Sequence, residues 1–248
     1  MKGAFFNKPL EWNIDIQGEA WQQGTCITGV VKVKNLGAEA ADISNAGVAL
    51  AHADIKKVHT RKDGALKLES QKTFEATSLA PAQTMELSFS LPLGANCAVT
   101  DKRSSYYITY GRDFNESHLM LKIEPRALYG KLIGLLDTFQ RFKVKEYKSG
   151  KHGVEYKLIP PTSRDMANVE SLALTFAMKE DQLHLSFDFQ VKKLDTTAVV
   201  TKVNKESTRI DRALTPKEYS LGRDMINQDQ LLKTFEGVMA EVKLKSVF

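Results

Sequence analysis

Apolar and polar residues alternate with a period of two along much of this chain. In each such run every second residue is apolar, and the clearest runs lie at 27–33, 85–91, 106–110, 119–123, 142–145, 154–158, 172–178 and 183–191. Successive side chains of a strand point to opposite faces, so each run predicts a strand with one buried face. A further strand is expected at 199–203. The alternation predicts a mostly β protein.

The spacing of these runs indicates the architecture. Short amphipathic strands separated by turn sequences form two sheets that bury their apolar faces against each other. The turn Lys179-Glu180-Asp181-Gln182 joins two runs into a hairpin, and Glu124-Pro125-Arg126 marks a boundary followed by an apolar connector to about Thr138. We therefore predict two tandem antiparallel β-sandwiches, at 1–125 and 126–248.

The last fifth of the chain has a helical pattern instead. Thr215-Pro216-Lys217-Glu218 has the residue types of a capping box, and Asn227 can cap a second helix. The apolar residues of that second helix recur at a period of 3.6, at Leu231, Leu232, Phe235, Val238, Met239 and Val242. This amphipathic C-terminal helix is expected to pack on its own domain, and docking on a partner or a second copy is the alternative.

Composition limits the classes of function. Lysine and arginine exceed aspartate and glutamate by five, which is too mild an excess for a dedicated nucleic-acid binder unless it is clustered. The first residues lack the apolar segment of roughly 7 to 15 residues that a signal peptide needs. The longest apolar stretch, 132–136, is too short to span a bilayer. Cys26 and Cys97 form no CxxC pair and are expected to be free thiols, so a cytoplasmic location is predicted.

Three segments of the first half occur in an informative order. A Gly-x-x-x-x-Gly-x-Val-x-Val strand spans Gly24 to Val33, and Leu79-Ala80-Pro81 leads to Phe89-Ser90-Leu91-Pro92. Ser105-Tyr106-Tyr107-Ile108-Thr109-Tyr110 follows. In this order the segments resemble the N-terminal domain of the arrestin superfamily, over roughly residues 10 to 124. The whole-chain layout looks most like the small bacterial sporulation-control proteins of that superfamily.

The resemblance implies two sandwiches in tandem that serve as an adaptor or regulator. The sequence departs from the family pattern where Ala82 replaces the glycine that usually follows the proline, and where Gly94-Ala95-Asn96 replaces a second proline. The charged residues by which eukaryotic arrestins sense phosphorylated receptors are not found, so that activity is not carried over. The second half of the chain resembles the family only in its length and in the spacing of its expected strands.

No catalytic residue, metal ligand or cofactor site is predicted. The sequence contains no Gly-x-Ser-x-Gly elbow, Walker loop or Gly-x-Gly-x-x-Gly turn. His52 and His59 near Asp54 form only a weak metal pattern, and solvated surface histidines are the favoured interpretation. The loop carboxylates, namely Asp15, Asp42, Asp54, Asp63 and Asp101, show no pairing for hydrolysis. Trp12 and Trp21 are expected to pack in the core or at its rim rather than to form a sugar-binding platform.

One charged segment stands out between Arg126 and Lys157. It holds eight cations against three anions, a local excess of five that equals the net charge of the chain. The cations expected to bind an acidic partner or an anionic surface are Arg141, Lys143, Lys145, Lys148 and Lys151. Lysines also protect an exposed strand edge against aggregation, which is the structural alternative. Aromatic residues are too few here to favour nucleic acid.

We therefore predict a non-enzymatic adaptor or regulator that binds other macromolecules. A carbohydrate-binding or carbohydrate-active β-sandwich protein is the alternative, which a cleft with two carboxylates would favour. A subunit that self-assembles through edge strands or its helix is a third hypothesis. Neither the partner nor the oligomeric state follows from the sequence.

Overall fold

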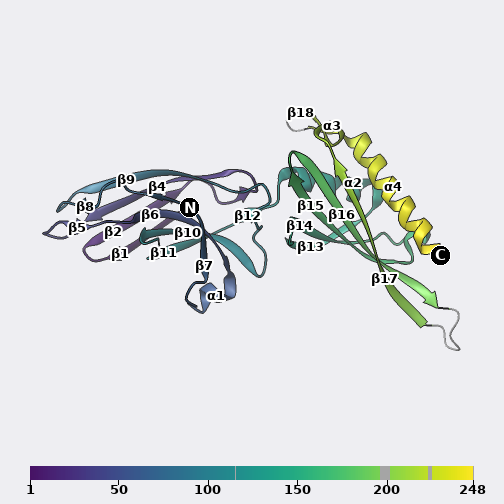
Figure 1. The fold of residues 1–248 in the computed structure, drawn as a ribbon, viewed down its shortest axis with the longest axis horizontal. Coiled ribbons are helices and arrows are strands. Elements are labelled where there is room, and N and C mark those ends of the chain that lie inside the picture. Colours follow the sequence, from purple (N-terminus) through teal and green to yellow (C-terminus); the bar gives the residue numbers. More distant parts are fainter. Residues whose placement is uncertain (115, 196–201, 223–224, 248) are drawn as a thin grey trace. The chain divides into compact units, whose positions relative to one another are not determined.

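The computed structural model describes residues 1–114, 116–195, 202–222 and 225–247. The chain divides into two compact units, Met1–Glu124 and Pro125–Phe248, and each is described by itself. Figure 1 shows strands throughout the first unit, and strands together with two long helices in the second.

The first unit is a sandwich of two antiparallel sheets. One sheet has the strand order β1-β2-β4-β9, and it is built from β1 (Lys2–Asn7), β2 (Leu10–Ile16), β4 (Cys26–Asn35) and β9 (Thr84–Pro92). The other has the order β11-β10-β6-β7, from β11 (Ser117–Leu121), β10 (Ser104–Arg112), β6 (Ala46–Asp54) and β7 (Leu66–Thr73). Short elements complete the unit: β3 (Trp21–Gln22), β5 (Ala41–Asp42), α1 (Ile55–His59), β8 (Ser78–Leu79) and β12 (Ile123–Glu124).

The apolar faces of the two sheets form the core of this first sandwich. Trp12 is fully buried there, stacked on Phe5 with ring centroids 5.9 Å apart and met edge-on by Phe74 at 6.3 Å. Ile27, Val31 and Val33 of β4 are buried, as their alternation predicts. Gly29, on the same strand, has no room for a side chain because a Cβ there would lie 2.4 Å from the Asp15 carbonyl oxygen.

The second unit contains a five-stranded antiparallel sheet in the order β13-β14-β15-β16-β17. Its strands are β13 (Lys143–Ser149), β14 (Val154–Ile159), β15 (Val169–Lys179), β16 (Gln182–Asp195) and β17 (Lys202–Leu214). The remaining elements are α2 (Ala127–Gln140), η1 (Arg164–Met166), α3 (Pro216–Tyr219), β18 (Ser220–Gly222), β19 (Met225–Ile226) and α4 (Gln228–Val247). The hairpin predicted at Lys179–Gln182 joins β15 to β16.

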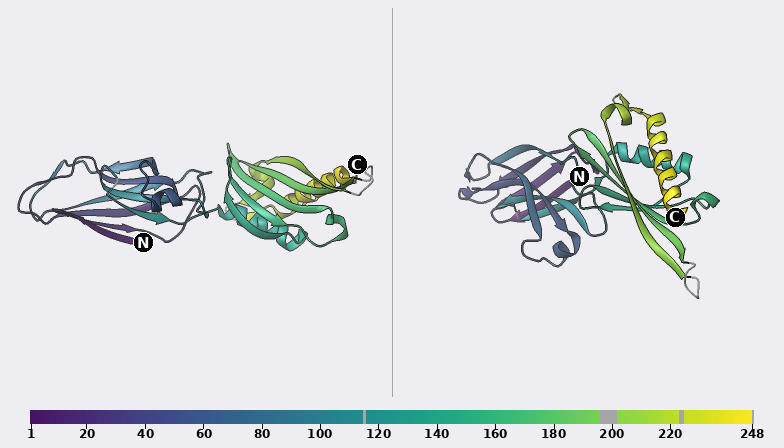
Figure 2. Two further views of the ribbon diagram at one scale, coloured as in Figure 1. Left: turned by 90° about the horizontal axis from the view of Figure 1, so that it is seen from below. Right: turned by 45° about the vertical axis from the view of Figure 1, so that its right-hand side comes forward.

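Helices, rather than the expected second sheet, cover the apolar face of this five-stranded sheet. Tyr129 of α2 stacks on Phe176 of β15 with ring centroids 5.0 Å apart, and Phe235 of α4 meets Phe187 of β16 edge-on at 6.1 Å. Both helices lie on the same side of the sheet (Figure 2). The mostly β character and the C-terminal helix are confirmed, whereas the second unit is a sheet backed by helices and not a second sandwich.

The prediction of a connector from Pro125 to Thr138 is wrong. This segment forms α2, and Tyr129, Leu132, Ile133, Leu135 and Leu136 are buried in it. Their spacing places them along one side of a helix, so the segment that looked like a linker supplies part of the core. The apolar side chains of α2 pack on the apolar face of the five-stranded sheet and remove it from water.

The predicted C-terminal helix is present and faces inward. Its stripe is buried at Leu231, Phe235, Val238, Met239 and Val242. The Asn227 side chain accepts a hydrogen bond from the Gln230 backbone N–H at 3.4 Å, as expected of a cap. Arg212 of β17 forms an ion pair with Glu241 of α4 at 2.7 Å, which adds a polar contact at the edge of the packed face.

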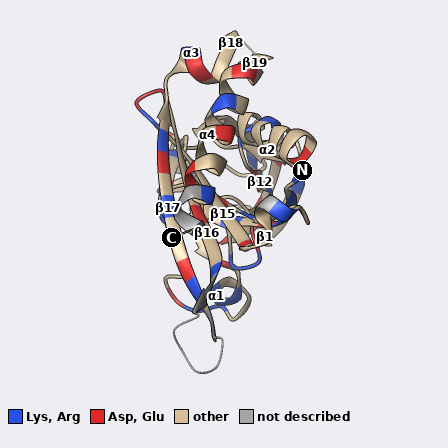
Figure 3. Cartoon of the chain, turned by 90° about the vertical axis from the view of Figure 1, so that its right-hand side faces the viewer, with Lys and Arg blue, Asp and Glu red and all other residues tan. Residues whose placement is uncertain are grey.

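Among the strands of six or more residues, periodicity missed or misplaced β1, β6, β7 and β17. Strand β6 is alanine-rich and buried on both faces, so no alternation marks it. Strand β17 begins at Lys202 and continues through a highly polar segment to Leu214, beyond the strand expected at 199–203. Val199 and Thr201 lie outside the described residues. Figure 3 shows charged residues of both signs along β17, which explains why hydrophobic pattern alone did not find it.

Ala82 occupies a backbone conformation that favours glycine. It follows Pro81 with φ of 58°, in a turn closed by the Gln83 N–H donating to the Ala80 carbonyl at 3.2 Å. Replacement of Ala82 by Gly is expected to raise the free energy of unfolding by about 1 kcal/mol, because it removes the cost of the left-handed conformation for a residue with a Cβ. Denaturant unfolding measures the change. Ala80→Gly, in the same turn at an ordinary φ, is the control and should give no stabilisation.

Phe235→Ala is expected to lower the free energy of unfolding by about 3 to 5 kcal/mol, because the ring is fully buried between α4 and β16 and leaves a cavity. Chemical denaturation of purified protein measures the loss. The exposed neighbour Glu236 provides the matched control, since its replacement by alanine should change stability by less than about 0.5 kcal/mol. A variant that keeps its stability but loses self-association would show that the ring docks on a second copy instead.

Candidate functional site

The five cations singled out by the sequence lie at one edge of the five-stranded sheet of the second unit. β13 is the outer strand and pairs only with β14 among the described strands. The set Arg141, Lys143, Lys145, Lys148 and Lys151 is called the basic edge below, and all five residues are exposed. Residues of β13 are exposed along almost its whole length.

The basic edge is not the straight row that alternation predicted. Arg141 is not in the strand, because it caps α2 in the left-handed conformation with φ of 60°. A β-bulge between Val144 and Glu146 leaves Lys145 without a partner on β14. Val144 is 44% exposed and does not face the core, whereas Phe142 is buried as expected. The bulge breaks the period of two, so Arg141, Lys143 and Lys145 do not project together from one strand face.

Two cations of the basic edge are compensated by carboxylates of the same chain. Lys143 lies 2.5 Å from Asp137 of α2, and Lys148 lies 2.9 Å from Glu155 of β14. The other three, Arg141, Lys145 and Lys151, have no ion pair within the part of the chain that the structure describes. The surface available to an acidic partner is therefore smaller than the sequence indicated.

A second candidate site lies on the face of the five-stranded sheet that the helices leave uncovered. Residues in register across the strands form polar rows on this face. One row runs Glu155, Thr175, Ser186, Asp211, and its neighbours run Ala177, His184, Ala213 and Ala173, Asp188, Arg209. Because the central positions carry small side chains and the outer ones carry long charged ones, the face is hollow in the middle.

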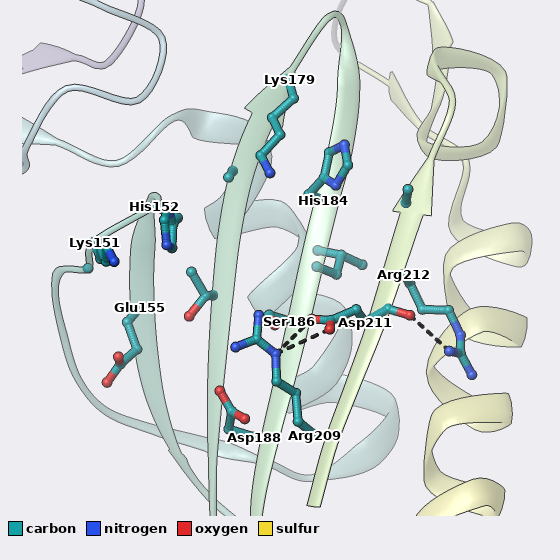
Figure 4. A pocket seen from close by; sticks show the side chains of 15 residues that line it. Lys151, His152, Glu155, Lys179, His184, Ser186, Asp188, Arg209, Asp211 and Arg212 are labelled. Carbon is teal, nitrogen blue, oxygen red and sulfur yellow. Dashed lines mark hydrogen bonds and ion pairs between the residues drawn. The ribbon is translucent and has the colours of Figure 1, made fainter.

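This hollow is a cavity of about 660 Å³, called the polar cavity below. Lys151, His152, Lys179 and His184 line one end, where the β13–β14 and β15–β16 turns meet the sheet (Figure 4). Glu155, Asp188, Arg209 and Asp211 line the rest (Figure 4). Thr175 and Ala177 are among the remaining lining residues. Its volume falls in the range of about 300 to 1,000 Å³ that is usual for small-molecule sites.

Hydrogen bonds and ion pairs neutralise much of the charge at the acidic part of the cavity. The Ser186 hydroxyl donates to the Asp211 carboxylate, and Arg209 Nε donates to it at 3.1 Å. The Ser186 hydrogen bond, supported by Arg209, holds the pKa of Asp211 below its ordinary value. A glycosidase needs a general acid with a raised pKa, so Asp211 is unsuited to that role.

The polar cavity was missed by sequence reasoning, which treated the solvent-facing positions of the hairpin as uniform. The small side chains at the solvent-facing positions of the first strand of this hairpin are the sequence signal that could have revealed the cavity. Ala173, Thr175 and Ala177 occupy successive outward positions of a central strand, where long polar side chains are usual on a solvated face. Cross-strand register, which pairs them with Asp188, Ser186 and His184 in that order, follows only from the structure.

The other residues considered from the sequence have structural roles. Asp42, Asp54 and Asp101 accept backbone N–H groups of Ser44, Lys57 and Arg103 in turns and caps. His52 lies against Tyr106 with ring centroids 5.1 Å apart, and His59 is exposed on α1.

Trp12 and Trp21 are both buried, as expected, and supply no exposed platform for a sugar. Cys26 and Cys97 are free thiols. Within the described residues no group of three or more His, Cys, Asp or Glu side chains is placed to hold a metal ion. No described helix is long and apolar enough to cross a membrane.

No family model matches the sequence, and a comparison with curated proteins finds no match. Among solved structures, the sporulation control protein Spo0M from Bacillus subtilis matches with a TM-score of 0.61 at 15% identity, over 95% of this chain and 99% of that one.

Two further matches are weak. A β-glucosidase from Listeria innocua has a TM-score of 0.30 at 9% identity, over 46% of this chain and 16% of the enzyme. A secreted serine protease from Vibrio cholerae, VesC, has a TM-score of 0.28 at 14% identity, over 82% of this chain and 43% of the protease. Likeness at this level carries no argument about this chain. The match to Spo0M does, and it shows that this chain shares the fold of that sporulation control protein, which confirms the predicted resemblance at the level of the fold.

Proposed function

We propose that this protein is a non-enzymatic adaptor that binds an acidic protein partner through the basic edge. The observation that carries the proposal is the pair Arg141 and Lys145. Both side chains are exposed, Lys145 on the outer strand β13 and Arg141 at the end of α2 just before it, and neither has an ion pair within the described ranges. Uncompensated charges at a solvent-exposed edge attract a partner of opposite sign, which raises the rate and the specificity of association.

Two further observations support a regulatory rather than a catalytic role. The fold is shared with a protein described as a sporulation control protein. The acid–base groups of the polar cavity are in part engaged with one another, since Asp211 accepts from both Ser186 and Arg209.

The two free thiols support the cytoplasm as the place of action, because disulfides are rare in that compartment. Residues 1–125 and 126–248 are proposed to be separate domains.

Edge protection by lysine makes a different prediction from partner binding. If a lysine only prevents strand pairing, its replacement by glutamine leaves the affinity for every partner unchanged, although the variant aggregates more readily. A lysine that binds a partner loses affinity when its charge is removed, and that affinity falls with salt because exposed charges are screened over about 8 to 10 Å. The bulge at Lys145 is compatible with both roles, so the binding measurement decides.

Replacement of both Arg141 and Lys145 by glutamine is expected to weaken binding to polyglutamate about fivefold at low salt. Two exposed charges at about 0.5 kcal/mol each sum to about 1 kcal/mol. Fluorescence anisotropy with labelled polyglutamate, at low and high salt, measures the change. The control variant replaces Lys217 and Lys233, two exposed lysines of α3 and α4, and should bind like the wild type.

Equal affinity of the double variant and the wild type at low salt would contradict the proposal and leave edge protection as the role of these residues. Sedimentation with anionic liposomes tests the competing partner class, and light scattering of both variants detects self-assembly. Binding to liposomes without binding to polyglutamate would replace the acidic protein partner by a membrane surface.

A further inference from the structure

The cations and imidazoles at one end of the polar cavity have no anionic partner. None of the side chains of Lys151, His152, Lys179 and His184 forms a hydrogen bond or an ion pair within the part of the chain that the structure describes. We infer that this end of the polar cavity is a binding site for an oxyanion, a phosphate or a carboxylate, carried by a ligand that extends along the sheet.

Two turns place these side chains over a common floor. Gly153 holds the β13–β14 turn against β15, since a Cβ at this position would lie 2.0 Å from the Phe176 carbonyl oxygen and 3.1 Å from the Ala177 Cβ. Lys151 and His152 precede it in this turn, while Lys179 ends β15 and His184 is the third residue of β16. His184 pairs in register with Ala177 and Ala213, whose small side chains leave the space in front of the imidazole open.

Neighbouring carboxylates do not neutralise this end. Glu155 is paired with Lys148, and Asp211 with Arg209. Asp188 lies four residues beyond His184 on the same strand, which is about 13 Å along a strand. Glu180 and Asp181 follow Lys179 in the turn, but neither forms an ion pair with the four side chains within the described ranges. Ammonium and imidazole N–H groups that face one cavity without an anion match an oxyanion acceptor.

The rest of the cavity indicates what the oxyanion is attached to. A volume of about 660 Å³ is far larger than a phosphate group requires. Glu155 and Asp188 line the part beyond the oxyanion end and offer hydrogen-bond acceptors. The ligand therefore combines an oxyanion with donor groups such as hydroxyls or amides. A sugar phosphate and a short acidic peptide both have this chemistry, and the experiment distinguishes them.

The site does not depend on the proposed adaptor function. It lies on the face of the sheet, whereas Arg141 and Lys145 lie at the edge, and only Lys151 belongs to both surfaces. The Arg141 and Lys145 double variant is expected to keep its affinity for inorganic phosphate, which separates the cavity from the basic edge because polyglutamate carries carboxylates that both surfaces attract. Loss of phosphate binding in a variant of Lys179 and His184 leaves the basic edge untouched.

The test is a titration of the full chain, followed by amide NMR shifts, with inorganic phosphate, glucose 6-phosphate and an acetylated tetraglutamate amide in separate arms. Chloride at matched ionic strength is the blank. Shifts are expected at Lys151, His152, Lys179 and His184, with a dissociation constant at or below about 1 mM for the better of the two extended ligands. The arm that binds more tightly than inorganic phosphate identifies the body of the ligand.

The variant Lys179→Gln with His184→Gln is expected to weaken binding at least about tenfold, as loss of a charge-assisted hydrogen bond does. Lys217→Gln with Lys233→Gln removes charge elsewhere in the same unit and should leave affinity unchanged. Thermal unfolding checks the fold, and Lys179→Gln alone, an exposed change at a strand end, serves if the double variant is unstable. Absence of shifts in all three arms, or equal affinity of the cavity variant and the wild type, would overturn the inference.

Discussion

The second unit depends on one constraint, which is the removal of an aromatic sheet face from water. Phe176, Phe187 and Phe189 are fully buried on this face, each of them large enough to contribute several kcal/mol when it leaves water. Tyr129 of α2 and Phe235 of α4 are the rings that cover it. Because two helices provide the cover, the opposite face of the sheet stays open to solvent, and both candidate surfaces follow from this arrangement.

The open face and the open edge of the sheet carry different kinds of side chain. At the edge, β13 carries lysines, a bulge at Lys145 and the ion pairs of Lys143 and Lys148, which are features that disfavour pairing with another strand. On the face, small residues at Ala173, Thr175 and Ala177 leave a hollow among long polar side chains. An edge built in this way resists strand addition and presents charge, whereas the hollow can enclose part of a ligand. The two surfaces are therefore suited to different ligands.

The first unit shows how two of the residues that carry the sequence resemblance are set by backbone geometry. Gly29 stands where β4 passes the Asp15 carbonyl too closely for a side chain, which explains the glycine of the Gly-x-Val-x-Val strand. Ala82 stands where the pattern that the sequence resembles has glycine, and its positive φ shows that the turn requires a conformation to which alanine is less suited. The match to Spo0M shows that the same fold can form from a sequence that is only 15% identical.

Sequence alone determined the elements that are long and regularly patterned. The alternation in β4, β9, β15 and β16 and the apolar stripe of α4 follow from local periodicity, because a strand or a helix with one buried face must repeat at its own period. Only the tertiary structure decided what lies against each face. That 127–140 covers a sheet rather than linking two, that a bulge turns Val144 outward, and that His184 shares a cavity with Lys151 all depend on residues distant in the chain, whose register no local pattern encodes.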